Sequence, residues 1–169
     1  MAIHAGVGLS NNKESYQAGY EACMLAVKNI GAEKPDFLFV FGSVVFDQKE
    51  MIRGVREASD RVPLIGCTDA GTITQAGPSQ KSVAVMAIQS DQMTFTNGLG
   101  ADIKADAREA GRQVARDIKG KSRDPLRTLI MLPDVLTGNG ADIVRGVLDI
   151  LGPHFPLVGG AAGDDFLFQ

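Results

Sequence analysis

The chain has 169 residues, of which 44% are hydrophobic and 22% charged, and its formal net charge is −3 at pH 7. This length allows one domain with a sizeable core, and the slightly acidic balance leaves no basic footprint for a nucleic acid. The apolar runs are too short to cross a bilayer, and the opening MAIHAGVGLS lacks the pattern of a signal peptide. The two cysteines, Cys23 and Cys67, are too few for a disulfide framework or a metal set. We therefore expect a cytoplasmic globular protein with no nucleic-acid or membrane partner.

The first predicted elements are a strand, a helix and a second strand. Residues 3–9 alternate in polarity as a strand does. The following helix has Asn11 and Glu14 as a plausible cap pair and Gly31 as its end. The continuous apolar run FLFVF at 37–41 is typical of a strand covered on both faces.

The next elements continue the alternation. The apolar spacing over residues 51–58 predicts a second helix, and PLIG at 63–66 predicts a third strand. The segments KSVAVMAIQ and MTFTNGL, 81–89 and 93–99, are expected to form two strands of a hairpin that turns at residues 90–91.

The same order then begins again. Small and apolar residues stripe a helix over 107–118 that closes at Gly120, and TLIML at 128–132 predicts a buried strand. A further helical stripe runs over 143–151, and PLVG at 156–159 completes the series. Strands alternating with helices predict an α/β fold with a largely parallel or mixed sheet flanked by helices.

A sequence offset of 92 residues places the second half of the chain on the first. The matched positions are Met1 with Met93, Gly8 with Gly100, Ala18-Gly19 with Ala110-Gly111, and Arg53-Gly54-Val55 with Arg145-Gly146-Val147. After one extra residue, PLIG meets PLVG. We interpret the chain as one domain, 1–169, built from duplicated β-α-β-α-β units at about 1–92 and 93–169. Convergence is the alternative, because all such units share apolar strands and glycine stops.

The second predicted unit is incomplete. It has no counterpart of residues 83–88, so we expect a C-terminally truncated fold whose sheet has an open edge of unpaired backbone groups. Another chain, as in a homo-oligomer, or a rearranged tail is expected to cover that edge.

Four glycine-rich loops follow predicted strands, beginning at Gly42, Gly66, Pro133 and Gly159. In open α/β sheets ligands bind beyond the carboxyl ends of the strands, where small residues let a ligand approach backbone N–H groups. Acidic side chains there suit an α-amino group, although tight turns with solvated acids would have the same pattern. The candidate ligand-binding residues are Ser43, Gly66, Cys67, Thr68, Asp69, Gly71, Gly159, Gly160, Gly163, Asp164 and Asp165.

Sharper motifs are incomplete. Gly6-x-Gly8 lacks the third glycine of a dinucleotide site, no phosphate loop occurs, and no cofactor or metal site is expected. Cys67 lies at a strand-to-loop turn where a nucleophile could lie, with His4 and His154 as the only imidazoles. An enzyme using Cys67, or a protein-interaction scaffold, therefore remains an alternative to a binding domain.

Several segments in order resemble the N-terminal part of the FIST domain. They are GVGLS, FVFGS, PLIGCTDAG, LPDVLTGN and, most specifically, PLVGGAAGDDFLF, over about Gly6 to Phe168. The resemblance implies a prokaryotic sensory module of signal transduction that binds a small ligand such as an amino acid, without a known catalytic constellation. It also implies a C-terminal FIST region and signalling output domains, which this chain lacks.

Overall fold

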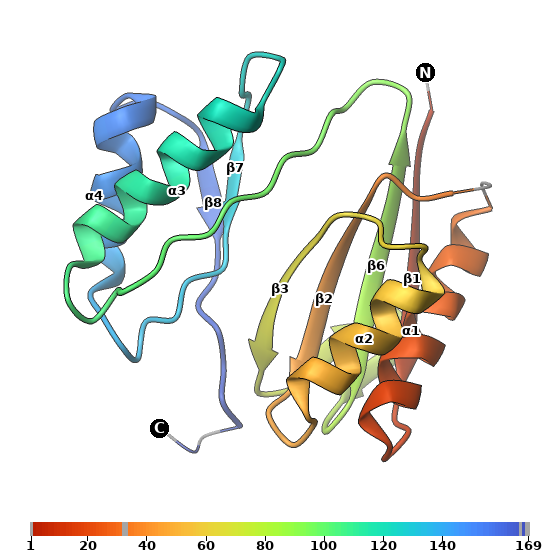
Figure 1. The fold of residues 1–169 in the computed structure, drawn as a ribbon. Helices are drawn as coiled ribbons and strands as arrows, with labels where there is room; N and C mark the ends of the chain where they lie inside the picture. Colours follow the sequence, from red (N-terminus) through yellow and green to blue (C-terminus); the bar gives the residue numbers. More distant parts are fainter. Residues whose placement is uncertain (1, 32–33, 166, 168–169) are drawn as a thin grey trace. The chain divides into compact units, whose positions relative to one another are not determined.

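The computed structural model describes residues 2–31, 34–165 and 167. The chain divides into two compact units (Figure 1). The first holds residues 1–95 together with 163–167, and the second holds residues 96–162.

The first unit contains a four-stranded sheet and two helices. Its elements are β1 (Ile3–Ser10), α1 (Ser15–Ile30), β2 (Phe37–Ser43), α2 (Gln48–Ala58), β3 (Leu64–Asp69), β4 (Thr72–Thr74), β5 (Gly77–Ser79) and β6 (Val83–Ser90). The sheet order is β1-β6-β2-β3, with β6 antiparallel to both of its neighbours and β2 parallel to β3. The carboxyl ends of β1, β2 and β3 therefore lie at the same end of the sheet, beside the start of β6.

Both helices of this unit pack on the same face of the sheet (Figure 1). Alternate residues of β2 and β6, including Leu38, Val40, Val83 and Val85, join the buried side chains of α1 and α2 in one core. The residues between them point to the other face. The continuous apolar run of β2 corresponds to burial of both faces, since Phe37 and Phe39 are buried as well as Leu38 and Val40.

The second unit contains two helices and a two-stranded parallel sheet. Its elements are α3 (Ala107–Lys121), β7 (Leu129–Met131), α4 (Gly140–Leu151) and β8 (Leu157–Gly159). The α/β class and the mixed, partly parallel sheet predicted from the sequence are thus confirmed.

The expected hairpin between 81–89 and 93–99 is wrong. Only its first strand forms, as β6, and both edges of β6 are already paired, with β1 on one side and β2 on the other. Residues 93–99 therefore find no free side of β6 to pair with, and they form no strand. Instead, Gly98 and Gly100 lie close to α3.

Two local details also differ from expectation. The Asn11–Glu14 cap pair is not formed, because the Asn11 side chain donates to Ser79 Oγ at 2.8 Å and no side chain caps α1. The short antiparallel pair β4–β5 was not anticipated, because its Thr-Ile-Thr strand is only three residues long.

Candidate functional site

The candidate site lies in the first unit, at the carboxyl ends of the neighbouring strands β2 and β3. Ser43 and Asp69 are paired partners at the carboxyl ends of these two parallel strands. Ligands of open α/β sheets bind beyond such ends. The first unit therefore brings Ser43, Thr68 and Asp69 together as the sequence suggested.

Ser43 is a fully buried serine that organises the loop after β2. Its hydroxyl accepts the Val45 N–H at 3.2 Å, and its carbonyl accepts the Gln48 side-chain amide at 3.0 Å. The same amide also donates to the carbonyl of Phe46 at 3.0 Å. These bonds fix the backbone between β2 and α2, so the Ser43 hydroxyl has a defined position.

Residues 163–165 belong to the first unit and lie against the end of β3. The Gly163 N–H donates to the carbonyl of Thr68 at 2.8 Å, and the Ser43 hydroxyl donates to the Asp165 carboxylate. A Cβ at Gly163 would come within 2.8 Å of the Ala70 nitrogen, so this close approach requires glycine. Residues 122 positions apart thus meet at one place. Only one Asp165 oxygen accepts a hydrogen bond from the described residues.

Ser82 is the unexpected member of this cluster. It is 1% exposed, and its hydroxyl is the buried side-chain oxygen that has no hydrogen-bond partner among the described residues. The Ser43 N–H donates to the carbonyl of Ser82 at 3.2 Å, which makes the two residues neighbours across adjacent strands. The sequence signal for Ser82 is its place directly before the apolar run of β6. The sequence pattern used for the site covers only loops that follow strands, so it did not select this residue.

Ser82 and Ser43 point to the same face of the sheet. Val83 belongs to the core under the helices, so Ser82 faces away from them. Gly42 faces α2, since a Cβ there would lie 2.6 Å from the Met51 sulfur, and Ser43 therefore faces away as well. The hydroxyls of both serines and the Asp165 carboxylate consequently share the face opposite α1 and α2.

Asp69 closes its own turn. Its carboxylate accepts the Gly71 N–H at 3.3 Å and the Thr72 hydroxyl at 2.5 Å. Gly71 has a φ of 137°, a conformation that glycine adopts without strain. Each Asp69 oxygen thus accepts one hydrogen bond within the turn, whereas one oxygen of Asp165 accepts none from the described residues.

The remaining predicted residues are distributed differently. A Cβ at Gly66 would collide with the carbonyl of Val40, and one at Gly159 with the carbonyl of Met131, so both glycines serve strand pairing in their own units. Gly160 donates to the Met131 carbonyl at 3.2 Å in the second unit. Asp164 lies beside the cluster, and its carbonyl accepts the Leu167 N–H at 3.1 Å.

Cys67 is half-buried on β3. Burial raises the pKa of its thiol, and the nearby charge of Asp69 raises it further. The described residues provide no hydrogen-bonded base for the sulfur, and His4 lies on β1, at the opposite edge of the sheet. The thiol is therefore protonated at neutral pH, which is unfavourable for a nucleophile. Burial likewise raises the pKa of Cys23, to about 11.

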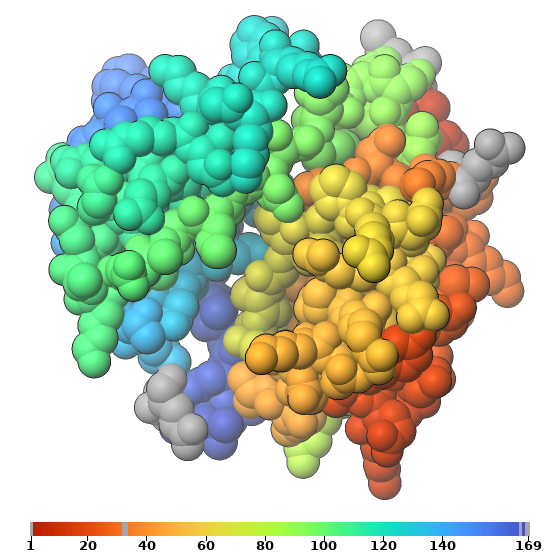
Figure 2. Space-filling view, viewed as in Figure 1, coloured from red at the N-terminus to blue at the C-terminus, as the bar shows by residue number. Residues whose placement is uncertain are grey.

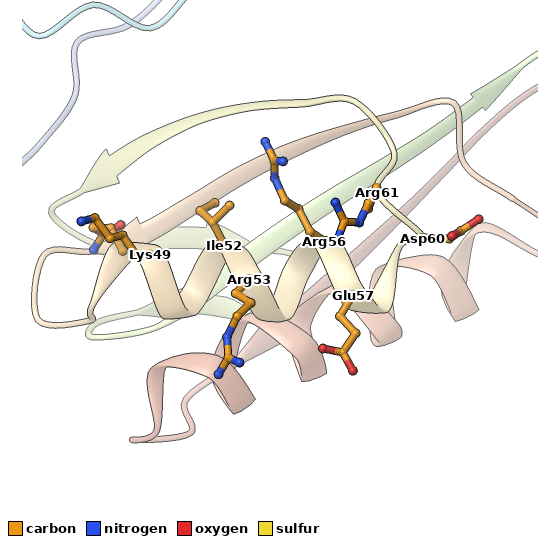
Figure 3. Close-up of a pocket in the computed structure, with 8 residues that line it drawn as sticks. Lys49, Ile52, Arg53, Arg56, Glu57, Asp60 and Arg61 are labelled. Carbon is orange, nitrogen blue, oxygen red and sulfur yellow. The ribbon is translucent and has the colours of Figure 1, made fainter.

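A shallow hollow runs along the exposed side of α2, whose side chains (orange to yellow) lie on the surface of the first unit (Figures 2 and 3). Its lining residues are Gln48, Lys49, Ile52, Arg53, Arg56, Glu57, Asp60 and Arg61. They all come from one helix and the turn that follows it. None of the candidate ligand-binding residues named from the sequence lines this hollow.

Metal-ligand clusters and membrane-spanning helices are both absent from the described part of the chain. No group of three or more histidine, cysteine or acidic side chains is arranged to hold a metal ion in that part. Within the same residues, each helix is too short or too polar to traverse a bilayer.

Comparisons with known proteins identify the family. No curated protein matches the chain. One similar solved structure is that of the FtsZ W319Y mutant, P1, from M. jannaschii, with 18% identity and a TM-score of 0.35. The match covers 52% of this chain and 27% of the FtsZ chain, so this chain spans about a quarter of that protein's length. The family model of the FIST N domain matches residues 36–169, from just before β2 onward. The chain therefore belongs to the FIST family, a family of sensory domains in signal transduction.

Proposed function

We propose that the chain senses a small metabolite at the carboxyl ends of strands β2 and β3 in the first unit. The ligand would contact the Ser43 and Ser82 hydroxyls, the Asp165 carboxylate and the backbone around Gly163. Thr68, Asp69, Gly71 and Asp164 would shape the rim, and Cys67 would line the strand beneath. Gly66, Gly159 and Gly160 are left as supports of the strands rather than contacts.

The chemistry of this edge favours a ligand that carries a protonated amine. Asp165 keeps an oxygen that accepts nothing from the described residues, and Asp69 places a second carboxylate at the ends of the same strands. An ammonium group can donate to a carboxylate and to a serine hydroxyl at once. An amino acid or a related amine therefore fits the donors and acceptors best.

The Ser82 hydroxyl is the observation that carries this proposal. A buried hydroxyl without a partner costs about 1–3 kcal/mol in desolvation. Such groups are rare in folded proteins and call for a physical explanation. A ligand that hydrogen-bonds Ser82 would remove this cost when it binds.

Membership of a sensory family supports a signalling role. We infer that ligand binding is reported to a signalling output domain outside residues 1–169, and that the module works in the cytoplasm. Two free cysteines are compatible with a reducing compartment.

A thermal-shift screen with the twenty amino acids and simple primary amines tests the proposal. A ligand that binds only the folded state at a concentration of 100 Kd adds about 2.7 kcal/mol of stability. Ser82→Ala should leave the ligand-free protein as stable as before or more stable, because no hydrogen bond of that hydroxyl is lost. The same substitution should reduce the ligand-induced shift.

Ser10→Ala is the matched control. Ser10 is also a buried serine at the end of a strand, but its hydroxyl donates to Glu21 at 2.7 Å and faces the helices. Ser10→Ala should therefore destabilise the free protein by about 1 kcal/mol and keep the ligand-induced shift. If no amine shifts the unmodified protein, or if Ser82→Ala responds to ligand as the unmodified protein does, the proposed site is wrong.

A further inference from the structure

The side chains of α2 that line the hollow project in two directions. Lys49, Ile52 and Arg56 follow one another at helical spacings of three and four residues, so they share one side of α2. Figure 3 shows Ile52 and Arg56 pointing away from Glu57. Arg61, in the turn after α2, lines the same hollow. Lys49, Ile52, Arg56 and Arg61 together form what we name the basic face.

The cations of the basic face have no acidic partner, although acids lie close to them along the chain. Glu50 is ion-paired with Arg53, and Asp60 is ion-paired with Lys34 at 2.8 Å. Glu57 acts on a tyrosine of α1, whose pKa it raises. The basic face forms no ion pair with the described residues, so it carries three uncompensated positive charges on a chain whose net charge is −3.

The second unit shows that the fold does not require these cations. The positions of α4 that correspond to the basic face at the offset of 92 residues are Ala141, Val144 and Leu148. Val144 matches the apolar Ile52, but alanine and leucine replace the two cations of α2. Both helices nevertheless make the same glycine contacts with their partner helix. The packing of the helix pair therefore does not explain the lysine and the arginine of α2.

The backbone at Arg61 is a second, independent observation. Its φ is 60° and that of Asp60 is 54°, so both residues adopt the left-handed conformation. This conformation is unfavourable for most residues that have a Cβ, and glycine or asparagine usually adopts it at the end of a helix. Backbone outliers of this kind concentrate at functional sites. An arginine thus occupies a position that glycine would adopt more easily, which indicates a use for its charge.

We propose that the basic face is a docking surface for an acidic amphipathic helix of another protein. Lys49 and Arg56 lie seven residues apart, which is about 10 Å along the axis of α2. Two acids seven residues apart on a partner helix match this distance. Ile52 lies between the two cations and packs only partly on the core, so an apolar residue between the partner's acids would contact it. Arg61 extends the positive charge beyond the end of α2.

The described helices of this chain do not offer such a partner, which argues against a second copy as the occupant. Acids seven residues apart occur as Glu50 and Glu57 in α2, and as Asp142 and Asp149 in α4. Between the acids of each pair, the third and fourth positions hold arginine and glycine, which supply no apolar contact for Ile52. The two acids of α4 are also ion-paired with arginines of their own unit.

A nucleic acid or an anionic membrane fits the basic face less well. Glu57 and Asp60 line the same hollow and would repel a continuous row of phosphates. The apolar side chain of Ile52 would also gain little from phosphate groups. Acids at two defined positions, with an apolar residue between them, use every side chain of the basic face.

The test uses a fluorescein-labelled helical peptide with glutamate at positions i and i+7 and leucine at i+3 and i+4. This pattern reads the same in both directions along the helix. The reference peptide has the same composition in scrambled order, and fluorescence anisotropy at about 50 mM salt measures both dissociation constants. We expect the designed peptide to bind at least about tenfold more tightly than the scrambled one, and to lose affinity as the salt concentration rises.

The combined substitutions Lys49→Glu and Arg56→Glu should weaken binding of the designed peptide at least about tenfold. The same variant should bind a peptide in which lysine replaces both glutamates, and this gain shows that the variant is folded. The matched control combines Lys13→Glu and Lys28→Glu, which change the net charge equally at exposed positions outside the hollow. The control should bind the designed peptide as the unmodified chain does.

Arg61→Gly separates charge from stability. It should weaken the designed peptide about threefold without lowering the melting temperature, because glycine adopts a positive φ freely. Equal affinity for the designed and scrambled peptides, or an equal loss in the control, would overturn the proposal. Tighter binding of a single-stranded DNA oligomer or of phosphatidylserine vesicles that depends on Lys49 and Arg56 would also overturn it, since phosphate would then be the ligand.

Discussion

The helix pair α1–α2 of the first unit and the pair α3–α4 of the second make the same glycine contacts where they cross. The side chains beside the two crossings differ. In the first unit, Gly19 lies against the carbonyl of Met51, and Gly54 lies against that of Tyr16. In the second unit, Gly111 meets Ile143, and Gly146 meets Arg108, all at the offset of 92 residues. Both helix pairs thus touch backbone to backbone at two glycines. This agreement supports our proposal that the units arose by duplication.

The side chains beside the two helix crossings interact differently at equivalent positions. The Glu57 side chain raises the pKa of Tyr16, and the Tyr16 ring lies under the Arg53 guanidinium, which is 4.7 Å from the ring centroid. In the second unit Arg108 forms two hydrogen bonds to Asp149, at 2.8 and 2.9 Å. Arg112 adds a third at 2.9 Å. The comparison teaches that backbone contact restricts a position to glycine, while an exposed pair can be replaced by another pair.

The largest expected effect comes from the crossing glycines. Gly54→Ala and Gly146→Ala each place a Cβ where a carbonyl oxygen lies, so the helices must separate. We expect each substitution to lower the free energy of unfolding by about 1–3 kcal/mol, as overpacking does. Urea denaturation followed by circular dichroism measures this loss.

Gly120→Ala is the matched control for both substitutions. Gly120 also lies in a helix, α3, but a Cβ there would have nothing within 4 Å. We expect this substitution to stabilise the protein by about 0.5–1 kcal/mol, because alanine is the better helix former. Equal changes in the free energy of unfolding for all three substitutions would contradict the backbone contact at the helix crossings.

A smaller effect is expected at the Arg108–Asp149 pair. The hydrogen bond from Arg108 is the main cause that lowers the pKa of Asp149 from 3.8 to about 2, and Arg112 contributes as well. The unfolded chain regains the ordinary pKa, so the stabilisation is present above the unfolded value and is lost as the pH falls to about 2. Asp149→Asn should thus lower the urea midpoint clearly at pH 7 and much less at pH 2.

The control for this pH dependence is Asp142→Asn. Asp142 pairs with Arg145 within α4 at 2.7 Å, on an exposed surface where such a pair contributes little. Its urea midpoint should follow that of the unmodified protein at both pH values. A constant loss for Asp149→Asn across this pH range would mean that packing, and not charge, joins α3 to α4.

The smallest effect is expected at Tyr16. The hydrogen bond to Glu57 is the main cause that raises the pKa of Tyr16 above 10, and burial adds to it. The stabilisation is present below pH 10 and disappears as the pH rises through the folded-state pKa. Tyr16→Phe should reduce the urea midpoint slightly at pH 7, and ultraviolet titration should detect one late-ionising tyrosine fewer. A normal ionisation in the unmodified protein would rule out this effect of Glu57 on Tyr16.

Most of the fold was accessible from the sequence, because its helices and buried strands have clear periodicity. FLFVF and the glycine stop at Gly31 correspond to β2 and the end of α1. The order of strands was not accessible, since β6 is inserted between β1 and β2, and this pairing leaves residues 93–99 without a partner.

The candidate site was only partly predictable. Spacing after strands selected Ser43 and Asp69, which meet because their strands are parallel neighbours. It also selected Asp165, but could not indicate that this residue returns to Ser43 across more than a hundred positions. Ser82 was missed because it precedes a strand, and its significance depends on burial, which no local pattern reveals.

The most direct test of the central claim is an NMR titration of the ¹⁵N-labelled protein with the amine that gives the largest thermal shift. Our account predicts that the amide signals of Ser43, Ser82 and Gly163 move together in the unmodified protein and remain still in Asp165→Asn. Signals that move along α2 while these three remain unchanged would contradict it.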